Sequence, residues 1–374
     1  MDFGFSEEQQ DLQGLATQIL EGELTHERLK EVEGGDENFD RELWAKLAEA
    51  GILGIALPEA NGGGGYGYLE TALVLEQVGR TVAPVPFYAT VIASLPIAKF
   101  GTDAQKDALL PGVISGETIL SAALTEAGTD PLHPTTTAKP DGAGYVLEGV
   151  KDCVPAGPLT DKVLCPAVTP DGNVIVAIVD PSAKGVTRER QDTTNQHAEA
   201  RLTLKGVKVG ADDVLGTADN GAEVLEWTVE RATAALCAIA VGICEEAVRM
   251  TAEYTKTREQ FDRPIATFQA VGQRAADAYI DTEAVRLTAW QAIWRLSEEI
   301  DASTEVAVAK FWAAEGGQRV VHAAQHLHGG MGVDRDYPLH RYFLWAKWLE
   351  LSLGGATRQL LTIGKHLAAE PVSA

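Results

Sequence analysis

The spacing of apolar residues changes twice along this 374-residue chain, and these changes constrain the fold more than any other sequence feature. Over residues 5–115, apolar side chains such as Leu12 and Leu15 recur at the helical period of 3.6. Over residues 118–216, short apolar runs alternate with Gly, Pro, Asp or Asn, which is typical of a small, mainly antiparallel β domain. From Asn220 onward, long apolar stripes with few helix breakers return, which favours long helices.

The helical segments predict a three-part molecule. Ser6-Glu7-Glu8-Gln9 reads as a capping box before the first helix. After residue 220, the pattern predicts three long helices and a short last one, at Val224–Thr257, Gln269–Ala302, Thr304–His328 and about Ala356–Ala368. Long helices joined by short connections pack as bundles. We therefore predict a mainly helical α+β fold, with an N-terminal helical domain (1–117), a central β domain (118–222) and a C-terminal four-helix bundle (223–374).

Charge and cysteine content exclude several classes of protein. The formal net charge of −23 argues against nucleic acid as a partner, because phosphate binding requires clustered Lys and Arg. No apolar run approaches the length of a membrane span, so no membrane segment is expected. The four cysteines form no CxxC pair, which indicates a reducing cytoplasm. Cys237 and Cys244 lie in an apolar helical stretch and are expected in the core.

Two patterns that could indicate ligand sites favour other interpretations. The run from Asn61 to Gly65 lacks the Lys-Ser/Thr of a phosphate loop, and we interpret it as a flexible loop between helices. His322, His326 and His328 lie at positions i, i+4 and i+6, but a metal site needs a convergent set that usually includes a carboxylate or thiolate. We therefore predict no metal site.

Three segments resemble the acyl-CoA dehydrogenase family. The stretch Arg258–Val271 reads REQFDRPIATFQAV and resembles the family's R-x-x-F-G-R-P-I…F-Q-x-V pattern. His328–Gly332, followed by Tyr337-Pro338, resembles its H-G-G-x-G…P segment, and Phe5–Gln9 resembles its usual opening. The match follows the family's order along the whole chain. It implies the helical–β–helical fold, FAD as cofactor, a tetramer, and α,β-desaturation of an acyl-CoA thioester.

The resemblance implies that this chain contacts FAD bound mainly to a neighbouring subunit. The planar guanidinium of Arg258 suits the FAD pyrophosphate. Gly329 and Gly330 would let backbone amides approach the ligand without a Cβ between them. The alternative for Arg258 is a surface ion pair with Glu259 or Asp262.

Four further residues of these segments are candidate FAD contacts. Phe261, Phe268 and Gln269 belong to the Arg258–Val271 stretch, and both phenylalanines have a core position as their alternative. His326 stands where the family often has a Gln that contacts the adenine half of FAD. Either ring nitrogen of a histidine can make such a contact.

The family's catalytic carboxylate has no counterpart at its usual position. In the commonest branch, a Glu before the last helix takes the α proton while the β hydrogen leaves to the flavin as hydride. Leu353 stands at that position here, and leucine cannot accept a proton. A second branch places the Glu in the first bundle helix, at about Ala232 in this chain, and Glu230 is the nearest carboxylate. Glu350, one turn from Leu353, is a weaker candidate.

The flavin-facing part of the β domain also departs from the family. The loop Leu124–Asp130 resembles the family's T-E-P-G-x-G-S-D loop but is two residues shorter. Cys153-Val154-Pro155 replaces the W-I-T segment that covers the flavin ring. Pro155 has neither a hydroxyl nor an N–H to offer the ring.

These losses resemble one half of the heteromeric (α2β2) acyl-CoA dehydrogenases of actinobacteria, several of which act on CoA esters of steroid side chains. The resemblance implies a non-catalytic subunit with a second, Glu-bearing subunit as partner, an acyl-CoA as substrate and an electron-transferring flavoprotein as electron acceptor. Two alternatives remain open. One is a self-sufficient homotetramer that uses Glu230 as base, and the other is a flavin-free scaffold with the same fold.

Overall fold

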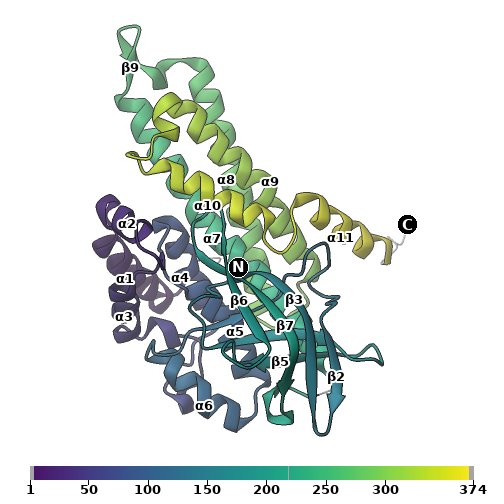
Figure 1. Ribbon diagram of the computed structural model, residues 1–374. Helices are drawn as coiled ribbons and strands as arrows, with labels where there is room; N and C mark the ends of the chain where they lie inside the picture. Colours follow the sequence, from purple (N-terminus) through teal and green to yellow (C-terminus); the bar gives the residue numbers. More distant parts are fainter. Residues whose placement is uncertain (1–3, 218, 370–374) are drawn as a thin grey trace. The chain divides into compact units, whose positions relative to one another are not determined.

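The computed structural model describes residues 4–217 and 219–369, whose contacts divide them into two compact units. The bundle unit takes its described residues from Met1–His26, Ala72–Ala83 and Thr233–Ala374. The sheet unit comprises Glu27–Thr71 and Pro84–Ala232. The predicted order of helices, sheet and helices is confirmed (Figure 1).

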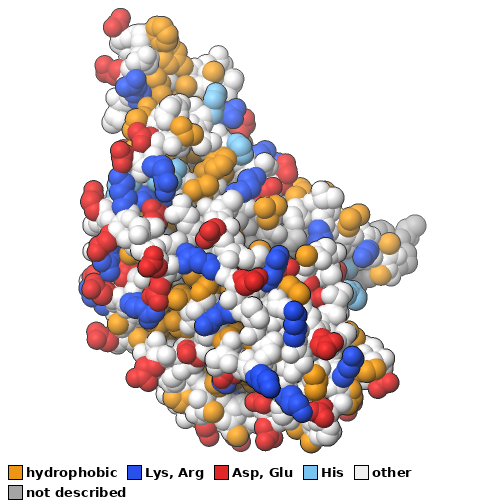
Figure 2. Space-filling view, in the orientation of Figure 1, with side chains coloured by type: hydrophobic (Ala, Val, Ile, Leu, Met, Phe, Trp, Pro, Cys, Tyr) orange, Lys and Arg blue, Asp and Glu red, His pale blue; other side chains and the backbone are white. Residues whose placement is uncertain are grey.

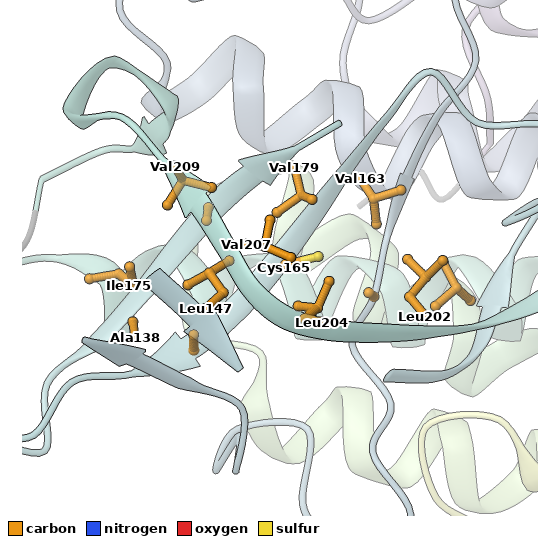
Figure 3. Packing of buried hydrophobic residues seen from close by; sticks show 14 of the residues in the cluster. Ala138, Leu147, Val163, Cys165, Ile175, Val179, Leu202, Leu204, Val207 and Val209 are labelled. Carbon is orange, nitrogen blue, oxygen red and sulfur yellow. The ribbon is translucent and has the colours of Figure 1, made fainter. Parts of the chain in front are cut away.

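The strands of the sheet unit form one mixed sheet in the order β6-β7-β3-β2-β4-β5-β8, with β1 paired to β4. The strands are β1 (Leu120–Ala122), β2 (Thr137–Asp141), β3 (Gly144–Pro155), β4 (Lys162–Val168), β5 (Val174–Val179), β6 (Val186–Asp192), β7 (Ala198–Val209) and β8 (Val214–Leu215). Alternate residues of these strands point to one face, and Leu147, Val163, Ile175, Leu202 and Val207 meet there in a buried cluster (Figure 3).

The helices of the sheet unit include α2 (His26–Glu33), α3 (Arg41–Glu49), α5 (Phe87–Phe100) and α6 (Asp103–Ile114). The glycine run that we interpreted as a flexible loop is instead a tightly hydrogen-bonded turn. The amide of Gly64 donates to Gly54 O at 3.0 Å and that of Gly65 donates to Leu57 O at 3.0 Å. A Cβ on Gly63 would lie 2.2 Å from Leu57 O. The amides of Gly62–Gly65 all donate to carbonyls of this chain, so none is left for a phosphate.

The bundle unit contains the helices α1 (Glu7–Glu23), α8 (Gln269–Ser297), α9 (Ser303–His328), α10 (Leu339–Leu351) and α11 (Ala356–Ala369). It also contains α4 (Tyr68–Thr81) from Ala72 onward and α7 (Gly221–Thr257) from Thr233 onward. Helices α8, α10 and α11 all pack on α9. Helix α8 ends at Ser297, five residues earlier than predicted, because the chain turns through Glu299 at φ +53°. Helix α10 was not among the predicted ranges.

Helices α4 and α7 approach each other at backbone contact. A Cβ on Gly79 would lie 2.1 Å from Ile239 O, and one on Gly242 would lie 2.0 Å from Glu76 O. Only glycine permits this crossing.

Helix α7 corrects the expectation about apolar runs. It contains an 18-residue window that is long and apolar enough to cross a membrane, although 83% of that window is buried inside the protein. Cys237 and Cys244 lie in this helix, and their predicted core positions are confirmed.

Candidate functional site

The hairpin between α7 and α8 carries most of the candidate FAD contacts. Strands β9 (Glu259–Gln260) and β10 (Arg263–Pro264) pair antiparallel, and Phe261 and Asp262 form the turn with φ +54° and +60°. The ring of Phe261 is 87% exposed, so its core alternative is wrong. Figure 2 shows exposed hydrophobic side chains at the end of the bundle unit where Figure 1 places β9.

Phe268 supports this hairpin from the start of α8. It is partly buried and meets Phe261 edge-to-face, with ring centroids 6.1 Å apart. The guanidinium of Arg263 lies 4.2 Å from the centre of the Phe268 ring, a cation–π arrangement. Gln269 is exposed and begins α8.

Arg258 lies at the base of the hairpin with its backbone fixed. Its amide donates to Tyr254 O at 2.8 Å, and its carbonyl accepts from the amide of Ile265 at 2.8 Å. Its side chain is exposed, and among residues 4–217 and 219–369 it makes neither an ion pair nor a hydrogen bond. The alternative pairing with Glu259 or Asp262 is therefore wrong, and the guanidinium is available to a ligand.

A buried histidine joins the hairpin to the glycine segment. His328 stacks on Tyr254 with centroids 4.3 Å apart. One ring nitrogen, Nδ1, lies 2.8 Å from Ala324 O and donates to it, so the other, Nε2, accepts from the Tyr337 hydroxyl at 3.2 Å. Burial lowers the pKa of His328, which keeps the ring neutral. The ends of α7 and α9 are thus held together, and the two family-like segments meet.

The glycine segment follows directly as a short 3₁₀ helix, η5 (Gly329–Val333). Gly329 adopts φ +58° and ψ −134°, a conformation essentially restricted to glycine. At Gly330 a Cβ would meet no atom of the described chain within 4 Å, so the space above its backbone is open. His326 is exposed on the last turn of α9. An unpaired guanidinium, an exposed ring and open glycine backbone fit an anionic, aromatic dinucleotide such as FAD.

The candidate histidines make separate contacts. His322 lies edge-on to Phe343, with centroids 4.8 Å apart, while His328 is engaged in its own network. Within the described ranges, no group of three His, Cys, Asp or Glu side chains could hold a metal ion.

Leu353 lies in the connection between α10 and α11, which contacts Gln359. The Gln359 side chain donates to the carbonyls of Leu353 and Gly354 at 3.4 and 3.3 Å. Leu353 has φ +53°, and its partly buried side chain is apolar. Glu350 pairs with Lys347 on the same helix. Leu353 therefore presents an apolar side chain here, and the nearby Glu350 carboxylate is engaged by Lys347.

Lys310 is a residue that sequence reasoning missed. It is fully buried in α9, and its ammonium donates to Leu349 O at 2.8 Å and to Glu350 O at 3.3 Å. The cation thus caps the C-terminal end of α10, where the helix dipole is negative. Burial lowers the pKa of Lys310 to about 8. The sequence signal for this buried position was a lysine within the apolar stripe of Val306, Ala309 and Ala313.

The alternative base position falls in the part of α7 that belongs to the sheet unit. Ala232 is fully buried, and the Arg231 guanidinium beside it lies 3.8 Å from the centre of the Trp227 ring. The Tyr68 hydroxyl donates to Arg231 O at 2.6 Å. Glu230 is partly buried.

The shortened loop of the β domain is anchored by a buried ion pair that the sequence did not reveal. Glu126 accepts from the amides and hydroxyls of Thr135 and Thr136 and from the Lys151 ammonium, which lies 2.6 Å from Oε1. Lys151 also donates to Pro166 O at 2.6 Å. Burial alone would raise the pKa of Glu126, but Lys151 and the threonine hydrogen bonds lower it to about 2.

The segment that replaces W-I-T uses its polar groups within the chain. The amide of Cys153, at φ +49°, donates to Gln191 Oε1 at 2.7 Å. The carbonyl of Pro155 accepts from the Ser121 hydroxyl at 2.6 Å. The amide of Cys153 and the carbonyl of Pro155 are therefore both engaged within the chain.

Comparison with known proteins defines the family. A model of the acyl-CoA dehydrogenase N-terminal domain matches residues 6–117, and a model of the C-terminal domain matches residues 219–368. This chain belongs to the acyl-CoA dehydrogenase family. The predicted family, its fold and its FAD-dependent oxidoreductase chemistry are thereby confirmed.

Individual relatives cover the whole chain. The sequence is 44% identical to acyl-CoA dehydrogenase FadE27 of Mycobacterium tuberculosis, over 99% of this chain and 100% of that protein. The fold is similar to a chain of the ChsE4–ChsE5 complex from Mycobacterium tuberculosis, with a TM-score of 0.94, 44% identity and full coverage of both chains. It is also similar to a chain of a variant of the Tcur3481–Tcur3483 steroid acyl-CoA dehydrogenase, with a TM-score of 0.92, 46% identity and coverage of 98% of this chain and 99% of that one.

Proposed function

We propose that this chain is the non-catalytic subunit of a heteromeric acyl-CoA dehydrogenase and completes the FAD site of a second, Glu-bearing subunit. The observation that carries the proposal is a contrast between two groups of residues. Leu353 stands without a carboxylate at the position of the family's base, whereas Arg258 remains unpaired among the described residues. General loss of function would affect both groups alike, so the retention of Arg258 alone favours a role in FAD binding without proton abstraction.

In this role the chain binds and orients the cofactor. Bound FAD would accept the β hydrogen of the acyl chain as hydride. The guanidinium of Arg258 would meet the pyrophosphate, and Phe261, with Phe268 behind it, would cover an aromatic face of the ligand. The backbone at Gly329 and Gly330 would approach closely, with Gln269 and His326 as polar contacts near them. The α proton would leave to the carboxylate of the partner.

The outer face of α8 supports a protein partner. Ile280, Leu287 and Trp294 recur every seven residues and remain 63%, 60% and 49% exposed. An apolar stripe of this kind on a helix suits an intersubunit contact. Two of the similar structures are heteromeric complexes by name, and one is named a steroid dehydrogenase. We therefore propose a heterotetramer that acts on a steroid side-chain CoA ester and passes electrons to an electron-transferring flavoprotein. The free cysteines favour the cytoplasm.

The test uses the complex purified from source cells through a tag on this chain. Recovery of a second dehydrogenase subunit, with FAD and turnover, supports the proposal. Turnover by this chain alone supports the homotetramer, and a complex without FAD supports the scaffold.

The role of Glu230 is tested in the same complex. Glu230→Gln keeps size and polarity but cannot take a proton, and we expect kcat to change by less than about threefold. Glu226→Gln, one turn earlier on α7, is the matched control. A loss of about a hundredfold in Glu230→Gln alone, with FAD content intact, would show that this chain carries its own base.

A further inference from the structure

The turn of the β9–β10 hairpin is strained by its own sequence. Gln260 pairs with Arg263, so Phe261 and Asp262 form a two-residue turn with positive φ at both positions. Such turns strongly prefer glycine at the second position, and the family pattern has glycine there. Asp262 keeps a conformation that glycine would adopt without strain. Residues held in sparsely populated conformations cluster at functional sites.

The charges of the hairpin are unpaired as well. Arg258, Glu259, Asp262 and Arg263 place two cations and two anions within six residues, and all four are exposed. Over the chain that the structure describes, none of them forms an ion pair, and the Asp262 carboxylate accepts no hydrogen bond. Beside Asp262, the Phe261 ring is almost fully exposed. The hairpin therefore ends in an exposed aromatic ring, supported by Phe268, and a carboxylate that has no partner among the described residues.

The chemistry of the cofactor excludes FAD phosphate as the group that meets Asp262, because two anions repel each other. Glu259 and Gln260 separate Arg258 from the turn, which begins at Phe261. A strand rises about 3.4 Å per residue, so the three steps from Arg258 to Phe261 span about 10 Å along the strand. Arg258 at the base of the hairpin suits the pyrophosphate, whereas Asp262 at the tip suits a protein cation.

We infer that Asp262 is a specificity contact whose carboxylate meets a Lys or Arg side chain of the second dehydrogenase subunit. This inference rests on the proposed function, because the partner is the subunit that the hairpin enters with Arg258. Such a contact requires a cation at the matching position of the partner. It would therefore favour the second dehydrogenase subunit over another copy of this chain. Charge pairs across interfaces select partners more than they add affinity.

The experiment measures dissociation of the tagged complex on dilution, by mass photometry, at 50 and 500 mM NaCl. Asp262→Asn removes the charge but tolerates positive φ, and Asp262→Gly also removes the strain. We expect both to weaken assembly about tenfold at 50 mM NaCl and much less at 500 mM, where salt screens the pair. Glu298→Gln removes an equal, exposed charge beyond the far end of the 29-residue helix α8 and should leave assembly unchanged.

The outcomes separate this inference from the proposed function. If Asp262→Asn and Asp262→Gly assemble as the wild type does, the inference is wrong, while a wild-type complex with FAD and turnover leaves the proposed function standing. If Asp262→Gly tightens assembly, Asp262 acts only on the turn. If intact complexes of Asp262→Asn lose FAD, Asp262 belongs to the flavin site instead. If the wild-type chain recovers no second subunit, both proposals fall.

Discussion

The buried pair of Glu126 and Lys151 gives the sharpest stability prediction. The side chains of Glu126 and Lys151 are 4% and 1% exposed, and Lys151→Met would remove the ammonium from Glu126 and from Pro166 O together. Breaking one partner of a buried pair leaves an uncompensated charge and costs about 3–5 kcal/mol. The double variant Glu126→Gln/Lys151→Met removes both charges, so we expect it to be more stable than Lys151→Met alone.

Hydrogen exchange of the β3 and β4 amides measures this cost locally, as the free energy of opening. Lys139→Met is the matched control, because Lys139 is exposed and its distance of 3.9 Å to Glu148 indicates a weak surface pair. A cost below about 1 kcal/mol for Lys151→Met, or a double variant as unstable as the single one, would refute the reasoning.

The same pair predicts a direction of pH dependence. The folded pKa of Glu126, about 2, lies below its ordinary value of 4.5. The stabilisation is therefore fully present above pH 4.5 and is lost as the pH falls from there toward 2. Lys151→Met should flatten this acid dependence.

Two further predictions concern the bundle unit. Arg258→Ala should weaken FAD binding by the complex by about 1.5–3 kcal/mol, measured as flavin release. The control Arg274→Ala removes another exposed and unpaired guanidinium and should leave FAD binding unchanged. Unchanged affinity in Arg258→Ala would show that Arg258 has no role in FAD binding. Burial and then the neighbouring Glu245 carboxylate raise the pKa of Glu76 to about 7, above its ordinary 4.5, so its cost to stability grows as the pH rises from 4.5 to 7. In thermal unfolding, the Glu76→Gln variant should be as stable as the wild type at pH 5 and more stable at pH 8, by at most about 3 kcal/mol in free energy of unfolding. Equal stability of the two proteins at pH 8 would contradict the pKa shift.

Features that depend on neighbouring residues could be predicted from the sequence. The capping box at Ser6 is present as predicted, with the Ser6 hydroxyl 3.2 Å from the Gln9 amide. The helical period located α7 and α9 to within a few residues. Helix α10 was not predicted because its buried face mixes tryptophans with the polar residues His340 and Arg341, which obscures the apolar period.

Features that depend on residues far apart in the sequence could not be predicted. Glu126 and Lys151 are 25 positions apart, and nothing near either one signals the pair. The glycine turn looked flexible because two of the carbonyls that order it belong to Gly54 and Leu57, outside the local run. Local patterns cannot supply such contacts, since chain topology brings them together.

The two family-like segments of the candidate site differ in whether their polar groups form hydrogen bonds or ion pairs within the chain. At the Cys153-Val154-Pro155 segment, the amide of Cys153 and the carbonyl of Pro155 are both bonded within the chain. At the hairpin, Arg258 and Asp262 have no partner among the described residues, although they lie near each other in sequence. Hydrogen bonds left unmade are costly when they are buried, whereas exposed groups such as Arg258 and Asp262 can remain available to a ligand or another subunit. Sequence resemblance located both segments, whereas the contacts show which of their polar groups are engaged within the chain and which remain available.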